Sequence, residues 1–241
     1  MVRVDDAPAA REMMMNRTVR STRVSRLPAG TYWIGSEGVA NASPRHVRRF
    51  AGDVWLDCDL VTWRHFAAFV SAGGCIDASW WRSADGTPFP DAARPASVDA
   101  RCEAVRGLTL AGAPPSWARP RGELPVLGLT WFEAAAVCHF FGGRLPFETE
   151  WEAAATQGLI ALDDSESPAA QEWCLDAYAS RYWRADAGVR GRAWQAGKQV
   201  VLRGHSASEP AVGATARRSA DPAVGIAGRG FRRVWERDPA A

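Results

Sequence analysis

The sequence contains almost no lysine, since Lys198 is the only one among its 29 lysine and arginine residues. Its formal net charge is only +2 at pH 7. A balance so close to neutrality gives no reason to expect a nucleic acid or an anionic membrane as a partner. The planar guanidinium of arginine, however, suits recognition of carboxylates and phosphates.

Long apolar runs are also lacking, and none of the hydrophobic stretches is long enough to span a bilayer. The first 26 residues carry charges but no apolar core of a secretion signal, so a cytoplasmic protein is expected. Residues 1–24 have no periodicity and are predicted to form a flexible N-terminal arm. Residues 25–236 are predicted to form one domain.

Metal-binding and disulfide patterns are absent from the sequence. Its five cysteines are an odd number with no C-x-x-C spacing, which predicts neither a zinc ribbon nor a disulfide framework. The four histidines include no pair at the helical spacing of metal ligands. They are His46, His65, His139 and His205.

The clearest local pattern begins at Thr130. Thr130 and Glu133 have the spacing of a capping box, in which each side chain binds the backbone amide of the other residue. Apolar residues then recur at helical spacing, which predicts a helix over 131–141. Gly142-Gly143 should end that helix, with one glycine in a left-handed conformation. A second short helix is predicted over 148–156, with Trp151 in the interior.

Earlier in the chain, alternating residues predict a strand within 27–36 that Gly35 closes, and strands at 44–50 and 54–62. His46 is interpreted as an ordinary strand residue. Thr62 should cap a helix that Gly73-Gly74 ends, and His65 in its first turn is interpreted as a surface residue. Residues 75–123 read as a long loop. Its twin tryptophans, Trp80 and Trp81, fit either core packing or the lining of a ligand pocket.

Three ordered motifs carry a family resemblance. The segment 124–155 resembles the pattern V-x-x-(T/S)-W-x-x-A-x-x-(Y/C)-x-(W/F)-x-G-x-R-L-P-x-E-x-E-W-E-x-A-A of the formylglycine-generating-enzyme (sulfatase-modifying factor) domain. The segment 27–36 is similar to that family's opening P-G-x-F-x-M-G-S. The closing segment, 199–234, is similar to V-x-R-G-G-S-…-R-x-x-x-R-…-G-F-R. Its wording is nearest to the C-terminal domain of the ergothioneine-type sulfoxide synthases.

The resemblance implies an α+β fold: a single irregular, C-type-lectin-like domain with few short helices, small antiparallel sheets and long ordered loops. It also implies where chemistry should occur. Members that generate formylglycine bind copper(I) through two cysteines of the closing segment, and this sequence has no cysteine after Cys174. Copper at a cysteine pair is therefore not expected. The sulfoxide synthases use iron held mostly by an additional helical domain, which has no counterpart among these motifs.

Calcium is not expected either, because it takes six to eight oxygen ligands and few acids of the family's calcium site are matched. Glu172 and Asp176 are the candidate metal ligands. His205 replaces a glycine of the family pattern and is the candidate catalytic residue, which Asp176 and Glu209 would accompany in a metal cluster. The cofactor is left unknown.

A cleft of arginines and aromatic residues is the predicted ligand site, because arginine forks suit a carboxylate on an amino acid or peptide. The alternative is that these arginines tie irregular backbone together. The candidate ligand-binding residues are Arg203, His205, Trp173, Tyr178, Arg217 and Arg232.

Two functions stay open. In the first, the protein is a ligand- or partner-binding subunit of a biosynthetic pathway, without formylglycine chemistry. In the second, it is an oxidative, non-haem-metal enzyme that acts on an amino-acid or peptide substrate, with an iron-binding partner in trans.

Overall fold

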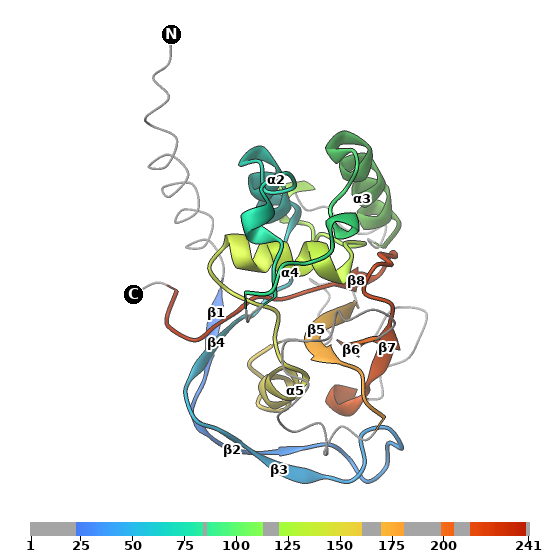
Figure 1. The fold of residues 1–241 in the computed structure, drawn as a ribbon. Coiled ribbons are helices and arrows are strands. Elements are labelled where there is room, and N and C mark those ends of the chain that lie inside the picture. Colours follow the sequence, from blue (N-terminus) through green and yellow to red (C-terminus); the bar gives the residue numbers. More distant parts are fainter. Residues whose placement is uncertain are drawn as a thin grey trace.

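The computed structural model describes residues 23–83, 86–112, 121–160, 170–180, 199–204 and 213–239. Helices and small sheets are mixed in it, as expected for an α+β fold (Figure 1). Helices α2, α3 and α4 gather at one end, whereas α5 lies beside the sheets, and the β2–β3 ribbon runs along the opposite end. Residues 1–22 of the expected arm lie outside the described part.

The strands form small sheets, as predicted. An antiparallel sheet has the order β1–β4–β9, a two-stranded ribbon pairs β2 with β3, and a mixed sheet has the order β7–β6–β5–β8. The strands are β1 (Val24–Leu27), β2 (Gly30–Ile34), β3 (His46–Phe50), β4 (Val54–Asp57), β5 (Gln171–Ala177), β6 (Val200–Gly204), β7 (Arg218–Ala220), β8 (Arg229–Gly230) and β9 (Val234–Trp235). His46 opens β3, so its interpretation as a strand residue is confirmed.

The helices lie close to their predicted positions, with one exception discussed below. The α-helices are α2 (Trp63–Ser71), α3 (Val98–Gly112), α4 (Trp131–Phe140) and α5 (Glu148–Thr156). Single 3-10 turns are η2 (Ala78–Trp80), η3 (Asp91–Ala93), η4 (Arg121–Glu123) and η6 (Gly213–Thr215).

The capping box at the start of α4 is confirmed. The Glu133 amide donates to Thr130 Oγ1 at 3.2 Å, and the Thr130 amide donates to Glu133 Oε2 at 2.8 Å. Arg101 of α3 also donates to both carboxylate oxygens of Glu133, at 2.6 Å each. Helix α4 is therefore anchored at its first turn both to its own cap and to a neighbouring helix.

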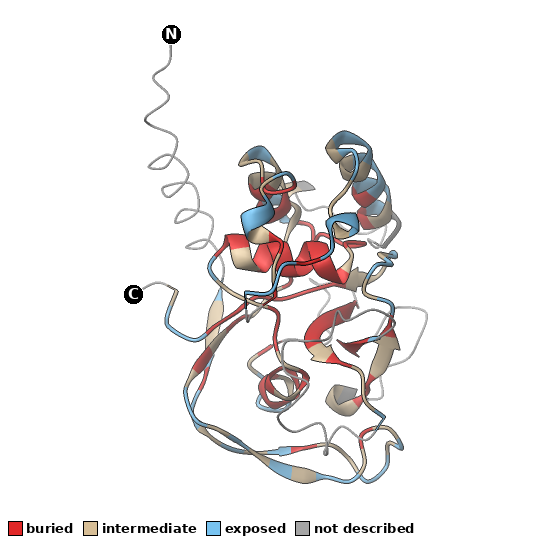
Figure 2. Cartoon of the chain, viewed as in Figure 1, coloured by how far each residue is buried: buried red, intermediate tan, exposed pale blue. Residues whose placement is uncertain are grey.

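Helix α4 is the centre of the larger core cluster. Nearly all of its residues are buried, which Figure 2 shows as a red helix, so the expected single apolar face is in fact a helix enclosed by its neighbours. Phe89 packs against Trp131 at 5.5 Å between ring centroids, and Phe69 packs edge-on against Phe140 at 5.4 Å. The indole of Trp131 donates to the Cys174 carbonyl of β5 at 2.8 Å, which joins the helix to the mixed sheet.

The turn after α4 and helix α5 also follow the prediction. Gly142 is left-handed, with φ of 73°. Arg144 then binds both carboxylate oxygens of Glu150 at 2.7 and 2.8 Å, which fixes the first turn of α5. Trp151 is fully buried in a second core cluster. The central motif thus folds as the family pattern implies.

The prediction that residues 75–123 are loop is wrong in its second half, because α3 occupies Val98–Gly112. Ser97 Oγ accepts from the Ala100 amide at 3.3 Å and caps the start of the helix. Only a narrow strip of the helix is buried, including Val105 and Thr109. The spacing of Val98, Cys102, Val105 and Thr109 is helical, but its weak apolar contrast concealed the pattern.

The interpretation of His65 as a surface residue is also wrong. His65 is only 4% exposed. Its Nδ1 lies 3.2 Å from the Thr62 amide that donates to it, and its Nε2 lies 3.2 Å from Arg233. The ring thus takes the place of a glutamate in a capping box and joins the start of α2 to the C-terminal segment, an arrangement that only the tertiary contact with Arg233 decides.

Of the two interpretations of the twin tryptophans, the structure favours core packing. Trp81 is buried and its indole donates to the Gly74 carbonyl at 2.8 Å. Trp80 lies edge-on to His139 and Phe140 of α4.

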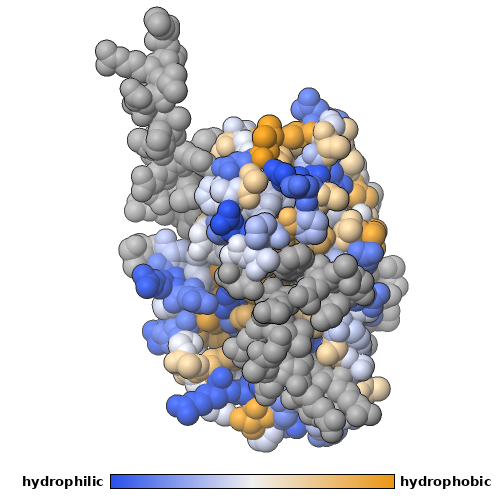
Figure 3. All heavy atoms as spheres, viewed as in Figure 1, coloured by the Kyte–Doolittle hydropathy of each residue, from blue (hydrophilic) through white to orange (hydrophobic). Residues whose placement is uncertain are grey.

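On the face shown in Figure 3, hydrophobic and hydrophilic residues are interspersed. No helix among the described residues is long and apolar enough to cross a membrane.

Candidate functional site

The family resemblance predicts that the closing segment folds back beside Glu172 and Trp173, and the strand pairing confirms it. Strand β6 pairs antiparallel with β5, with Glu172 opposite Arg203 and Trp173 opposite Leu202. Residues paired in this way project to the same face of a sheet, whereas neighbours in one strand project to opposite faces. Arg203 and Trp173 therefore lie on adjacent strands but on opposite faces.

Arg203 is fully buried, and both of its terminal guanidinium nitrogens donate hydrogen bonds. Its guanidinium donates to Glu152 of α5 and to the carbonyls of Thr215 and Ala216, at 2.9 and 3.1 Å. The Cζ atom lies 5.6 Å from the centroid of the Trp151 ring. Glu152 in turn accepts a hydrogen bond from the Gly35 amide. Arg203 thus ties β6, α5 and the chain before β7 together.

Arg232 has a similar environment on the other edge of β5. It donates to both carboxylate oxygens of Glu172, at 2.7 and 3.0 Å, and to the carbonyl of Cys58. Both partners of this ion pair are buried. Glu172, the candidate metal ligand, is therefore neutralised by an arginine.

Arg217 brings together more of the predicted residues. It donates to Glu148 Oε2 and Oε1 at 2.6 and 2.9 Å, and to the carbonyls of Asn41 and Ala179 at 2.7 and 3.1 Å. Its Cζ atom lies 5.1 Å from the ring centroid of Tyr178. The side chain of Arg217 is fully buried. The family motif predicts Arg203 within a side chain's reach of Tyr178, but the arginine that lies over the Tyr178 ring is Arg217, whereas Arg203 lies over Trp151.

Asp176 adds a second carboxylate beside Glu148. Its Oδ2 accepts from the Glu148 amide at 2.6 Å. Although part of the residue reaches the surface, desolvation of the carboxyl and the nearby charge of Glu148 raise its pKa to about 7, against the opposing effect of Arg217. A carboxyl with such a pKa can both hold and release a proton near neutrality.

Trp173 is paired with an arginine that sequence reasoning missed. Arg229 of β8 lies with its Cζ atom 5.0 Å from the Trp173 ring, and burial lowers the pKa of its guanidinium. The Trp173 indole donates to the Leu129 carbonyl at 3.0 Å. Arg229 immediately precedes the Gly-Phe-Arg motif of the closing segment, but only the parallel pairing of β8 with β5 brings it to the tryptophan.

The remaining site candidates are distributed as follows. His205 and Glu209, the expected partners of Asp176, lie outside the described residues. Within the described ranges, no group of three or more His, Cys, Asp or Glu side chains is placed to hold a metal ion. The site, as far as it is described, is a set of buried arginine–carboxylate pairs around β5 and β6, with one carboxyl that titrates near neutrality.

Comparison with known proteins identifies the family. The sequence model of the sulfatase-modifying factor enzyme 1-like domain (FGE-sulfatase) matches residues 10–168. A formylglycine-generating enzyme of Streptomyces coelicolor is 32% identical over 199 residues, which cover 74% of this chain and 60% of the relative. A formylglycine-generating enzyme of Thermomonospora curvata is 34% identical over 158 residues, covering 55% of this chain and 48% of the relative. The chain belongs to the sulfatase-modifying factor enzyme 1-like domain family.

The chain spans only 60% and 48% of the length of these two relatives. Among solved structures, PvdO from Pseudomonas aeruginosa is similar, with a TM-score of 0.56 over 88% of this chain and 94% of that chain. At 20% identity this likeness shows the fold alone.

Proposed function

We propose that this protein is a ligand- or partner-binding subunit of a biosynthetic pathway that does not carry out formylglycine chemistry. The observation that carries the proposal is that the arginines of the closing segment are already paired within the fold. Its arginines, Arg203, Arg217 and Arg232, each form a buried ion pair with a glutamate. Because these arginines are used in internal ion pairs, they stabilise the fold, and this supports a protein that acts as a scaffold presenting a surface or pocket.

The thiols support the same proposal. Copper(I) in a family member requires two thiolates, and thiolate formation depends on the pKa of the cysteine. Burial raises the pKa of Cys75 to about 12 and that of its neighbour Cys102, and it raises the pKa of Cys174 well above the usual value. None of these cysteines belongs to the closing segment, so the residues present do not fit a copper site of the family type.

The proposal is tested by incubating the purified protein with copper(I), oxygen and a cysteine-containing peptide, with the Streptomyces coelicolor relative as the positive control. Mass spectrometry would show the conversion of cysteine to formylglycine. We expect no product from this protein. Product formation at a rate comparable to that of the relative would refute the proposal.

Calcium gives a second test of the same proposal. Because Glu172 is neutralised by Arg232, we expect millimolar calcium to leave the melting temperature unchanged. A rise of several degrees would instead show that Glu172 has other oxygen partners and that the family's calcium-stabilised architecture is present.

One observation favours the oxidative alternative. The pKa of about 7 for Asp176 is typical of a carboxyl that takes part in proton transfer. In that case Asp176 would serve as an acid or base for a substrate bound next to Tyr178, with iron supplied by a partner. Oxygen consumption with iron(II) and amino-acid or thiol substrates tests this. Consumption that is lost in Asp176→Asn would favour the alternative.

A further inference from the structure

A hollow of about 570 Å³ lies beside the C-terminal half of α4. Its walls come from the loop around Arg82, the C-terminal half of α4, the turn over 141–145, and the chain after β9. The volume is in the range of pockets that hold small molecules. None of the predicted ligand-binding residues lines it.

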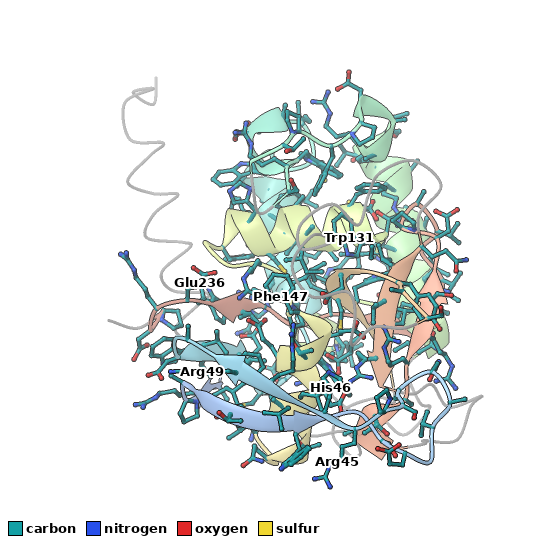
Figure 4. The ribbon with its side chains drawn as sticks, turned by 60° about the horizontal axis from the view of Figure 1, so that its bottom comes forward. Arg45, His46, Arg49, Trp131, Phe147 and Glu236 are labelled. Carbon is teal, nitrogen blue, oxygen red and sulfur yellow. The ribbon has the colours of Figure 1, made fainter. Side chains whose placement is uncertain are left out.

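Arg82 is a cationic group of the hollow that forms no ion pair with a carboxylate of the described residues. Its Nε atom is buried, and no described residue accepts a hydrogen bond from it. Every buried N–H of this kind is expected to have an acceptor, because an unsatisfied donor costs about 1–3 kcal/mol. The nearby Arg144, by contrast, is bound to Glu150 and lies 3.5 Å from Glu236. The Cζ atom of Arg144 also lies 4.6 Å from the ring centroid of Phe147, which Figure 4 labels together with Glu236.

His139 supplies a second polar group. Its Nδ1 lies 3.3 Å from the Trp80 carbonyl, which can only accept. Nδ1 therefore carries the proton in the neutral ring, and Nε2 is left as an acceptor. The edge-on contact with the Trp80 ring, at 5.5 Å between centroids, holds the imidazole in this orientation.

The floor of the hollow is apolar. It is made by side chains that are 0–6% exposed and come from four separate parts of the chain. They are Phe89, Phe141, Leu145, Leu175 and Trp235. Two exposed carboxylates, Glu236 and Asp238, also line the hollow, and Glu236 lies 3.5 Å from Arg144. The Arg82 guanidinium, which has no such pairing among the described residues, together with the apolar floor is complementary to a molecule with a carboxylate at one end and a hydrocarbon body.

We propose that this hollow is a binding site for a small carboxylate with an aromatic or branched apolar body. The Arg82 guanidinium binds the carboxylate, the apolar floor takes the hydrocarbon, and His139 Nε2 accepts a hydrogen bond from the ligand where one is offered. The inference goes beyond the proposed function, since it holds whether the protein only binds ligands or also catalyses a reaction.

The test uses isothermal titration calorimetry at constant ionic strength with three probes. 3-Phenylpropionate has both features, 3-phenylpropionamide lacks the charge, and acetate lacks the apolar body. We expect 3-phenylpropionate to bind at least tenfold more tightly than either of the others. Hydrogen exchange should then slow at the backbone of residues 81–83, 86–89 and 139–145 when the probe is present.

Arg82→Met should weaken binding of 3-phenylpropionate at least tenfold. The matched control is Arg45→Met, which makes the same change of charge at an exposed arginine next to β3, far from Glu236 in Figure 4. It should leave binding unchanged. If Arg82→Met does not fold, as judged by its melting curve, Arg82→Lys keeps the charge without the fork and should weaken binding severalfold.

The proposal is overturned if the carboxylate and the amide bind equally, if no probe binds, or if the Arg82 variant that folds binds as well as the Arg45 control. Because none of these measurements involves copper, calcium or formylglycine formation, their failure is distinct from failure of the proposed function.

Discussion

The substitution Arg217→Met tests whether Arg217 has a structural or a ligand-binding role. Methionine keeps much of the length of the side chain but removes the guanidinium. Glu148 then loses both of its hydrogen bonds from Arg217, and the carbonyls of Asn41 and Ala179 lose their donor. If the arginine is structural, the buried carboxylate is left without a partner.

The expected loss follows from the burial of the pair. The side chains of Arg217 and Glu148 are 0% and 5% exposed. Removing one partner of a buried ion pair destabilises a protein by about 3–5 kcal/mol, because the other charge stays buried and unpaired. We therefore expect urea unfolding at pH 8 to show a loss in this range. Arg45→Met, the exposed control, should lose less than about 0.5 kcal/mol.

The loss should depend on pH because Asp176 lies in the same cluster. Arg217 lowers the pKa of Asp176, so its removal raises that pKa above its present value of about 7. A group whose pKa is higher in the folded state stabilises the fold at low pH, and this contribution is lost as the pH rises through the folded pKa. The destabilisation should accordingly be smaller at pH 5 than at pH 8.

A double-mutant cycle with Glu148→Gln completes the test. The two substitutions should be coupled by about 1–3 kcal/mol, so that the double variant is more stable than the sum of the single losses indicates. A loss below about 1 kcal/mol for Arg217→Met, unaffected by pH and by Glu148→Gln, would refute the structural role. The guanidinium would then be available for a ligand.

Three further predictions concern the core, the titrating carboxyl and a turn. Trp151→Ala should lower the free energy of unfolding by about 3–5 kcal/mol in urea titrations, whereas Trp33→Ala, at a side chain 57% exposed, should cost far less. The wild-type protein should lose stability between about pH 4 and pH 7 because the pKa of Asp176 is raised. Asp176→Asn keeps an acceptor for the Glu148 amide and should remove on the order of 1–3 kcal/mol of that loss. This amount is smaller than the full pKa shift of Asp176 implies, because the residue is partly exposed. Gly74→Ala should lower the melting temperature, because its Cβ would overlap the Phe69 ring, while Gly52→Ala has nothing within 4 Å and should not.

Local sequence was sufficient where short-range chemistry decides the structure. The capping box of Thr130 and Glu133, the left-handed Gly142 and the bounds of α5 depend on hydrogen bonds and backbone angles within a few residues. The ordered motifs also determined the fold class and the pairing of the closing segment with Glu172 and Trp173. These features follow from patterns that are contiguous in the chain or shared by a family.

Partners distant in the sequence were decided only by the tertiary structure. Helix α3 was not predicted because it is only weakly amphipathic, and which of its residues are buried depends on its contact with α4. His65 looked like a surface residue until Arg233, 168 positions later, was placed against its Nε2. Whether an arginine is free or paired is equally non-local: Glu152 lies 51 residues from Arg203, and Glu148 lies 69 residues from Arg217.

The sequence by itself thus determined that this chain has the fold of its family and that no cysteine follows Cys174 in it, because motif spacing and residue inventory are properties of the chain alone. Only the tertiary structure decided which charges are neutralised and which, like Arg82, have a buried N–H without an acceptor among the described residues. The physical reason is that the interaction energy of a charge depends on burial and on the distance to its counterion, and both are set by packing between segments that the sequence does not place side by side.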